Sequence, residues 1–124
     1  MKNRTRLFTR SAVLLMAFGI SPAAFSVNYA CTGPVSGVTV GPGGTVSAES
    51  AGGQHWGYFC QLGATTNGNN PDACKGILAV LLTAQAQGKQ VHLWYNDDHS
   101  CAWHASNGSW AYLTTWYWGP SLLD

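Results

Sequence analysis

Apolar residues recur at helical spacing in the middle of the chain, and this stripe consists of Ile77, Leu78, Leu81 and Ala84. Asn70 is a residue type that caps helix N-termini, and Pro71 suits the first helical position. Gly88 suits the left-handed conformation that ends many helices. The spacing therefore predicts a helix from about residue 71 to residue 87.

The predicted helix is apolar well beyond this stripe, through Ala79, Val80 and Leu82. A helix that is apolar on most of its circumference needs cover on more than one side. Two interpretations stay open at this point. The helix plugs its own sheet, or it also contacts other copies of the chain in an oligomer.

Alternating apolar and polar residues predict three strands before the helix, over residues 35–40, 45–49 and 55–62. Residues 41–44 have the sequence Gly-Pro-Gly-Gly, which is typical of a turn, so the first two strands are predicted to form a hairpin. Residues 27–34 show no clear period and are expected to be an irregular lead-in.

Strands are also predicted after the helix. Residues 91–95 alternate, with the odd-numbered side chains on one face. Two further β segments are predicted over residues 101–105 and 109–118, separated by an Asn-Gly hairpin turn at residues 107 and 108.

The predicted element order is three strands, one helix, and two or more strands. One helix cannot cover a large open sheet, whereas it can plug a small barrel. The sequence therefore predicts an all-β fold with one helix, arranged as a small OB-fold-like barrel. Residues 27–124 are predicted to be a single domain without repeats or linkers.

Residues 1–26 have the features of a secretory signal peptide. Its basic residues are Lys2, Arg4, Arg6 and Arg10. A short apolar segment follows over residues 12–20, and it is too short to span a membrane. Cleavage is expected after Ser26, which makes the remaining chain secreted or periplasmic.

Cleavage at this position changes the sign of the charge. Lys75 and Lys89 are the only basic residues that remain, against five acidic residues, so the formal charge becomes 2 − 5 = −3 with neutral histidines. Nucleic acid and anionic lipid are therefore not expected as partners, because both require basic patches. The six tryptophans are candidates for a binding face.

The four cysteines are Cys31, Cys60, Cys74 and Cys101. In an exported chain of this size, two disulfides are expected. No C-x-x-C motif is present, so a zinc site is not expected, and no cofactor is predicted. Four cysteines allow three pairings. We predict Cys60 with Cys74, which closes a short polar loop before the helix, and Cys31 with Cys101.

Several short segments together carry a family resemblance. These segments are Ser36-Gly37-Val38, Tyr58-Phe59-Cys60, Ala73-Cys74, Gly88-Lys89-Gln90-Val91 and Leu93-Trp94-Tyr95. In their order and spacing, over residues 35–96, the chain resembles the B-subunit family of subtilase cytotoxin and, more loosely, the typhoid-type and pertussis-type B subunits. The resemblance implies an OB-fold, a ring of five subunits with the helices around a central channel, sialoglycan binding on the outer face, and a toxin A subunit as a further partner.

The resemblance also implies a sugar site. Ser36 matches a serine that hydrogen-bonds the sialic acid carboxylate, and Tyr95 matches a tyrosine that contacts the same sugar. Thr32 stands where the family has an acidic residue, and it is the third predicted ligand-binding residue. Ser36 and Tyr95 are expected to be neighbours in a shallow outer pocket, because their strands can pair in an OB barrel. The alternative is that Ser36 is a strand-edge residue and Tyr95 a core residue.

No catalytic site is expected. The residues 97–99, Asp-Asp-His, form the densest polar cluster, but these residue types are favoured in turns for backbone reasons alone. The aromatic residues near the end form either a sugar-stacking platform or part of the core and subunit interface: Trp103, Trp110, Tyr112, Trp116, Tyr117 and Trp118.

Three function classes therefore stay open. The first is a secreted glycan-binding B-subunit-type protein. The second is a secreted small-barrel inhibitor or structural interaction protein without sugar binding. The third is a small secreted hydrolase, which the sequence favours least.

Overall fold

The computed structural model describes residues 27–124, so the predicted signal peptide and its cleavage site lie outside the described residues. The elements in chain order are β1 (Tyr29–Pro34), β2 (Thr39–Val40), β3 (Thr45–Ala51), β4 (Gln54–Gln61), α1 (Pro71–Gln87), β5 (Gln90–Tyr95), α2 (Cys101–Ser106), β6 (Ala111–Tyr112) and β7 (Trp116–Leu122). One long helix thus lies between two groups of strands.

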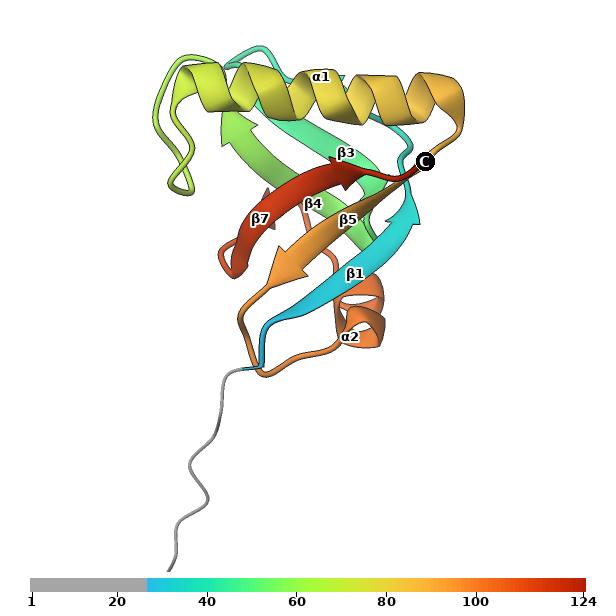
Figure 1. Cartoon of the computed structure of the whole chain (residues 1–124). Coiled ribbons are helices and arrows are strands. Elements are labelled where there is room, and N and C mark those ends of the chain that lie inside the picture. The colour runs from blue at the N-terminus through green and yellow to red at the C-terminus, as the bar shows by residue number, and fades with distance from the viewer. Residues whose placement is uncertain (1–26) are drawn as a thin grey trace, which may run out of the picture.

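The strands form two sheets, in the orders β1-β5-β7 and β2-β3-β4-β6. Just beyond β1, the backbone N–H of Ser36 donates to the carbonyl of Ser50 in β3 at 2.9 Å, which links the two sheets into a partly closed barrel. Figure 1 shows α1 lying across one end of this barrel and α2 at the opposite end. The predicted all-β fold, a small OB-fold-like barrel with one main helix, is confirmed.

Helix α1 begins and ends at the predicted residues. The side chain of Asn70 accepts a hydrogen bond from the backbone N–H of Ala73 at 2.8 Å, and Gly88 adopts a φ of 63°. The residues that α1 buries are Cys74, Ile77, Leu81 and Ala84. Leu82 remains 46% exposed, so the barrel covers only part of the apolar surface of α1.

The core contains large side chains from both sheets and from α1. Phe59 on β4, Leu81 on α1, and Leu93 and Tyr95 on β5 are fully buried. Phe59 also meets Trp116 of β7 edge to face, with ring centroids 5.5 Å apart. Burying a side chain of this kind contributes roughly 1.5–3 kcal/mol. The odd-numbered residues of the 91–95 segment face this core, as the alternation predicted.

Both predicted disulfides are confirmed. Cys60 at the end of β4 is bonded to Cys74 in the first turns of α1. Cys31 on β1 is bonded to Cys101 at the start of α2, and no described cysteine is free. Two disulfides indicate an oxidising location, extracellular or periplasmic.

The expectation of an irregular lead-in over residues 27–34 is wrong, because β1 pairs with β5 there along its whole length. A glycine and a proline hide the alternation of this strand from sequence analysis. A Cβ atom at Gly33 would lie only 2.3 Å from the backbone nitrogen of Gly53, so this close approach requires glycine. The strand predicted over residues 35–40 is reduced to β2, which has two residues.

The β segment predicted over residues 101–105 is wrong, because α2 occupies these positions. The side chain of Ser100 accepts a hydrogen bond from the backbone N–H of Trp103 at 3.2 Å and caps this helix. Asn107 ends the helix instead of turning a hairpin, and residues 109–118 divide into β6 and the start of β7. In the part of the chain that the structure describes, neither helix is long and apolar enough to cross a membrane.

Candidate functional site

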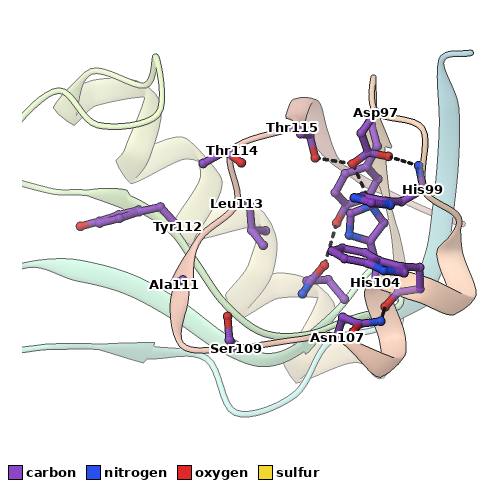
Figure 2. Close-up of a pocket in the computed structure, with 13 residues that line it drawn as sticks. Asp97, His99, His104, Asn107, Ser109, Ala111, Tyr112, Leu113, Thr114 and Thr115 are labelled. Atoms are coloured by element: carbon purple, nitrogen blue, oxygen red, sulfur yellow. Dashed lines mark hydrogen bonds and ion pairs between the residues drawn. The ribbon is translucent and has the colours of Figure 1, made fainter. Parts of the chain in front are cut away.

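Four polar side chains from distant parts of the chain meet at the α2 end of the barrel, and we call them the Asp97 cluster. Its members are Tyr29 on β1, Asp97 in the turn after β5, His104 on α2 and Thr115 just before β7. Figure 2 shows Asp97, Thr115, His99 and His104 grouped on one side of a cavity.

Asp97 is the acceptor at the centre of this cluster. Its Oδ1 accepts from the Tyr29 hydroxyl and from the backbone N–H of His99, and its Oδ2 accepts from the Thr115 hydroxyl. The side chain is only 7% exposed. Burial by itself would raise the pKa of Asp97, but the hydrogen bonds from Thr115, Tyr29 and His99 outweigh it and lower the pKa. Asp97 is therefore a buried carboxylate that stays ionised.

His104 lies between an aromatic ring and the carboxylate. Its ring stacks on Tyr95 with centroids 3.9 Å apart, and its Nε2 is 3.2 Å from Asp97 Oδ2 and 2.9 Å from the Tyr29 hydroxyl. Burial lowers the pKa of His104, although Asp97 acts in the opposite direction. His104 is therefore neutral at pH 7.

The tyrosines of this region are held in their neutral form. Burial raises the pKa of Tyr29, and its hydrogen bond to Asp97 adds to this shift. Burial likewise raises the pKa of Tyr95. Tyr29 can therefore act as a donor to Asp97 over the whole physiological pH range.

A cavity of about 180 Å³ adjoins the cluster, and we call it the His104 cavity. Figure 2 shows Asp97, His99, His104 and Asn107 on one side of it, and the segment from Ser109 to Thr114 on the other. At its rim the rings of His99 and Trp103 stack with centroids 3.7 Å apart and an angle of 6° between their planes. The cavity is thus open on one side, lined by both polar and apolar groups, with aromatic rings at its rim.

A neutral buried histidine predicts a pH dependence of stability. The folded-state pKa of His104 lies below its unfolded value of about 6.5, so the unfolded chain binds more protons in acid. We expect the urea midpoint to be constant between pH 8 and pH 7 and to fall below about pH 6.5. His55→Gln, at an exposed position, should keep this profile. A His104→Gln variant with the same acid slope as the parent would contradict this assignment.

A second concave surface lies where β7 passes the start of α1, and we call it the Trp118 groove. Its volume is about 610 Å³, and its lining includes Asn67, Asn69, Ile77, Tyr117 and Trp118. Trp118 is 67% exposed, the largest exposed fraction among the described tryptophans. None of the described residues that line this groove carries a charge.

The predicted outer pocket of Ser36 and Tyr95 is wrong. In the register of β1 with β5, Tyr95 lies opposite Tyr29, whereas Ser36 lies beyond the Pro34–Gln90 pair at the other end. Tyr95 is also fully buried under His104. The alternative interpretation, in which Tyr95 is a core residue, is the one that the structure supports.

Ser36 and Thr32 are exposed, but their surroundings do not favour a carboxylate ligand. The backbone N–H of Ser36 is used in the bridge between the sheets. The side chain of Glu49 crowds the adjacent Gly37, where a Cβ atom would lie 2.4 Å from Glu49 Cγ, so an anion there would meet a like charge. Thr32 is paired with His92 through Oγ1 and Nδ1 at 2.7 Å.

The residues 97–99 lie in a turn, as predicted, but the Asp97 cluster was not predicted from the sequence. Tyr29 and Asp97 are 68 positions apart, and Tyr29 belongs to β1, where the sequence shows no clear period. His104 belongs to the helix that was expected to be a β segment. Within residues 27–124, no three His, Cys, Asp or Glu side chains are placed to hold a metal ion.

Comparisons with known proteins identify no relative. No protein-family model matches the chain, and neither the curated proteins nor the solved structures give a match. The resemblance to toxin B subunits is therefore carried only by the short segments given above. The two concave surfaces are thus the features from which a function can be inferred.

Proposed function

We propose that this chain is a secreted glycan-binding protein and that the Trp118 groove is its binding surface. The observation that carries the proposal is the highly exposed Trp118 beside amide side chains in an uncharged groove. The volume of about 610 Å³ is in the range of ligand pockets, roughly 300–1,000 Å³. The two disulfides support the exported location that this function requires.

The chemistry of the groove suits a sugar ring. Trp118 and Tyr117 offer flat apolar faces on which the C–H face of a sugar can stack. Asn67 donates through Nδ2 to the carbonyl of Leu113 at 3.0 Å, and Asn69 donates through Nδ2 to the carbonyl of Asn67 at 3.1 Å. These bonds orient both amides, and each retains an Oδ1 acceptor for sugar hydroxyls.

The charge of the groove favours a neutral sugar over sialic acid. A carboxylate is usually bound by cationic groups or by several free N–H donors. The groove has no cationic lining residue among those described, and the family's predicted carboxylate contact at Ser36 lies next to Glu49. The proposal is therefore a terminal neutral hexose or N-acetylhexosamine.

Replacing Trp118 with Ala is expected to weaken glycan binding by about tenfold to thirtyfold, which corresponds to about 1.4–2 kcal/mol. Trp110→Ala is the matched control. Trp110 is also an exposed tryptophan, with 50% of its surface accessible, but it lies outside the groove. Isothermal titration calorimetry, with a glycan that the parent protein binds, measures the affinity of each variant. Equal losses in the two variants would contradict the assignment of the site.

The proposal includes a homopentameric ring with α1 near its axis. Gly76, Ala79 and Leu82 lie at successive i, i+3 positions and are exposed on the outer side of α1, so a small-residue apolar face is free for contact. A ring would also increase avidity over a weak single site. Light scattering of residues 27–124 at micromolar concentration should show about five times the protomer mass, and a species of only ~10 kDa would contradict the ring.

A further inference from the structure

The structure assigns a second ligand site: we infer that the His104 cavity binds one neutral, hydroxyl-bearing ring of monosaccharide size. This cavity and the Trp118 groove share no lining residue. The inference is therefore independent of the function proposed for the groove.

The size of the cavity sets the size of the ligand. Its volume is about 180 Å³, and an apolar protein cavity of about 150 Å³ is large enough to hold a six-membered carbon ring. The His104 cavity differs from such a cavity in its polar lining, which includes Ser109, Thr114 and Asn107. A single ring with hydroxyl groups fits both its volume and its chemistry.

The Asp97 cluster determines which ring nitrogen of His104 can accept a hydrogen bond from a ligand. The Tyr29 hydroxyl donates a hydrogen bond to Asp97 Oδ1, and the ionised Asp97 carboxylate can only accept. Both neighbours of His104 Nε2 are therefore acceptors towards it, so Nε2 carries the ring proton in the neutral histidine. Nδ1 then has a bare lone pair that acts as an acceptor.

This lone pair accepts no hydrogen bond from the described residues. His104 is 5% exposed and lines the cavity, and no hydrogen bond to its Nδ1 is formed within residues 27–124. No fully buried side-chain nitrogen or oxygen in that range lacks a partner, so Nδ1 must be reachable from outside. A fixed acceptor on a buried and oriented ring, at a cavity of ring size, is a feature of a built binding site.

The charges around the cavity favour a neutral ligand. An anion would be repelled by the ionised Asp97, while a cation would find the oxygens of Asp97 already taken by Tyr29, His99 and Thr115. A ligand hydroxyl can instead donate to Nδ1 of His104. The exposed hydroxyls of Ser109 and Thr114, which also line the cavity, offer further polar contacts.

The same geometry predicts how pH changes this binding. The titratable groups that face His104 are Asp97 from the turn after β5, Tyr29 from β1, Tyr95 from β5 and His99 from the segment before α2. Of these, Asp97 and the two tyrosines keep their protonation state between pH 5 and pH 8, since the Asp97 pKa is lowered and the tyrosine pKa values are raised. Protonating His104 converts Nδ1 from an acceptor into a donor, so binding should fall in acid.

The test is long-range ¹H–¹⁵N NMR of the imidazole of His104 in the oxidised protein, with glucose, galactose, mannose and N-acetylglucosamine as probes at millimolar concentration. We expect Nδ1 to be the unprotonated nitrogen at pH 7.5 and to shift on addition of at least one sugar. We expect this shift to disappear at the acidic pH at which the same spectra show that His104 has become protonated. Trp118→Ala should leave this shift unchanged, which separates the cavity from the groove.

Ala111→Phe fills the cavity from β6 without touching the Asp97 cluster, and Ala105→Phe on the exposed side of α2 is its matched control. We expect about a tenfold or greater loss of sugar affinity for Ala111→Phe only. If Ala111→Phe does not fold, as judged by circular dichroism, Ser109→Leu provides the same obstruction. A protonated Nδ1, no shift with any of the four sugars, or unchanged binding by the filled variant would each overturn the inference.

Discussion

Replacing Asp97 with Ala is expected to lower the free energy of unfolding by about 3–5 kcal/mol. Asp97 accepts hydrogen bonds from Tyr29, Thr115 and the backbone N–H of His99, and it lies 3.2 Å from His104. Its removal leaves these donors without their acceptor in a largely buried cluster, and each unpaired buried group carries its own penalty. The loss approaches half of the total stability of a typical small domain.

Asp98→Ala is the matched control for this prediction. Asp98 is adjacent in sequence, but its side chain is 92% exposed, and its only described ionic neighbour is His99 at 3.7 Å. Its replacement should change stability by no more than about 0.5 kcal/mol. Urea unfolding followed by circular dichroism at pH 7.5 measures both variants. Similar stabilities for Asp97→Ala and the parent would show that the cluster has no structural role.

Removing the Cys31–Cys101 disulfide with Cys31→Ala and Cys101→Ala together is expected to lower stability by about 4 kcal/mol. The bridge closes a loop of 70 positions, and a longer closed loop constrains the unfolded chain more strongly. It also fastens α2, and therefore His104, to β1, which carries Tyr29. We expect the Asp97 cluster to loosen together with the disulfide.

The other disulfide is the comparison for this experiment. Cys60 and Cys74 are 14 positions apart, so replacing both with Ala should lower stability less, by about 3 kcal/mol. The indole of Trp103 on α2 should report the difference, since its fluorescence environment should change when α2 is released from β1. A smaller loss for the Cys31–Cys101 pair than for the Cys60–Cys74 pair would contradict this order.

The elements with strong local signals could be predicted from the sequence. Helix α1 has its cap at Asn70 and its stop at Gly88, and the alternation of residues 91–95 matches β5. The disulfides followed from export and from the loop before α1. In contrast, β1 was missed because Gly33 is required by the close approach of Gly53, and this contact lies between segments that are distant in sequence.

Much less of the candidate site could be predicted from the sequence. The family resemblance placed Tyr95 on the outer surface, but the stacked ring of His104 covers it. The Asp97 cluster depends on the register of β1 against β5 and on α2, neither of which has a sufficient local signal. The sequence marks the tryptophans as a group, but only the fold separates Trp118, which is 67% exposed in the groove, from Trp116, which is buried beneath it.

The central claim is that this chain binds glycans through the Trp118 groove, and a glycan array tests it most directly. The protein for this test is the refolded and oxidised chain of residues 27–124, applied next to its Trp118→Ala variant. We predict binding of the parent to glycans with neutral terminal sugars, and a clear loss of signal for the variant. Binding of the parent to no glycan, or equal signals from both proteins, would contradict the claim.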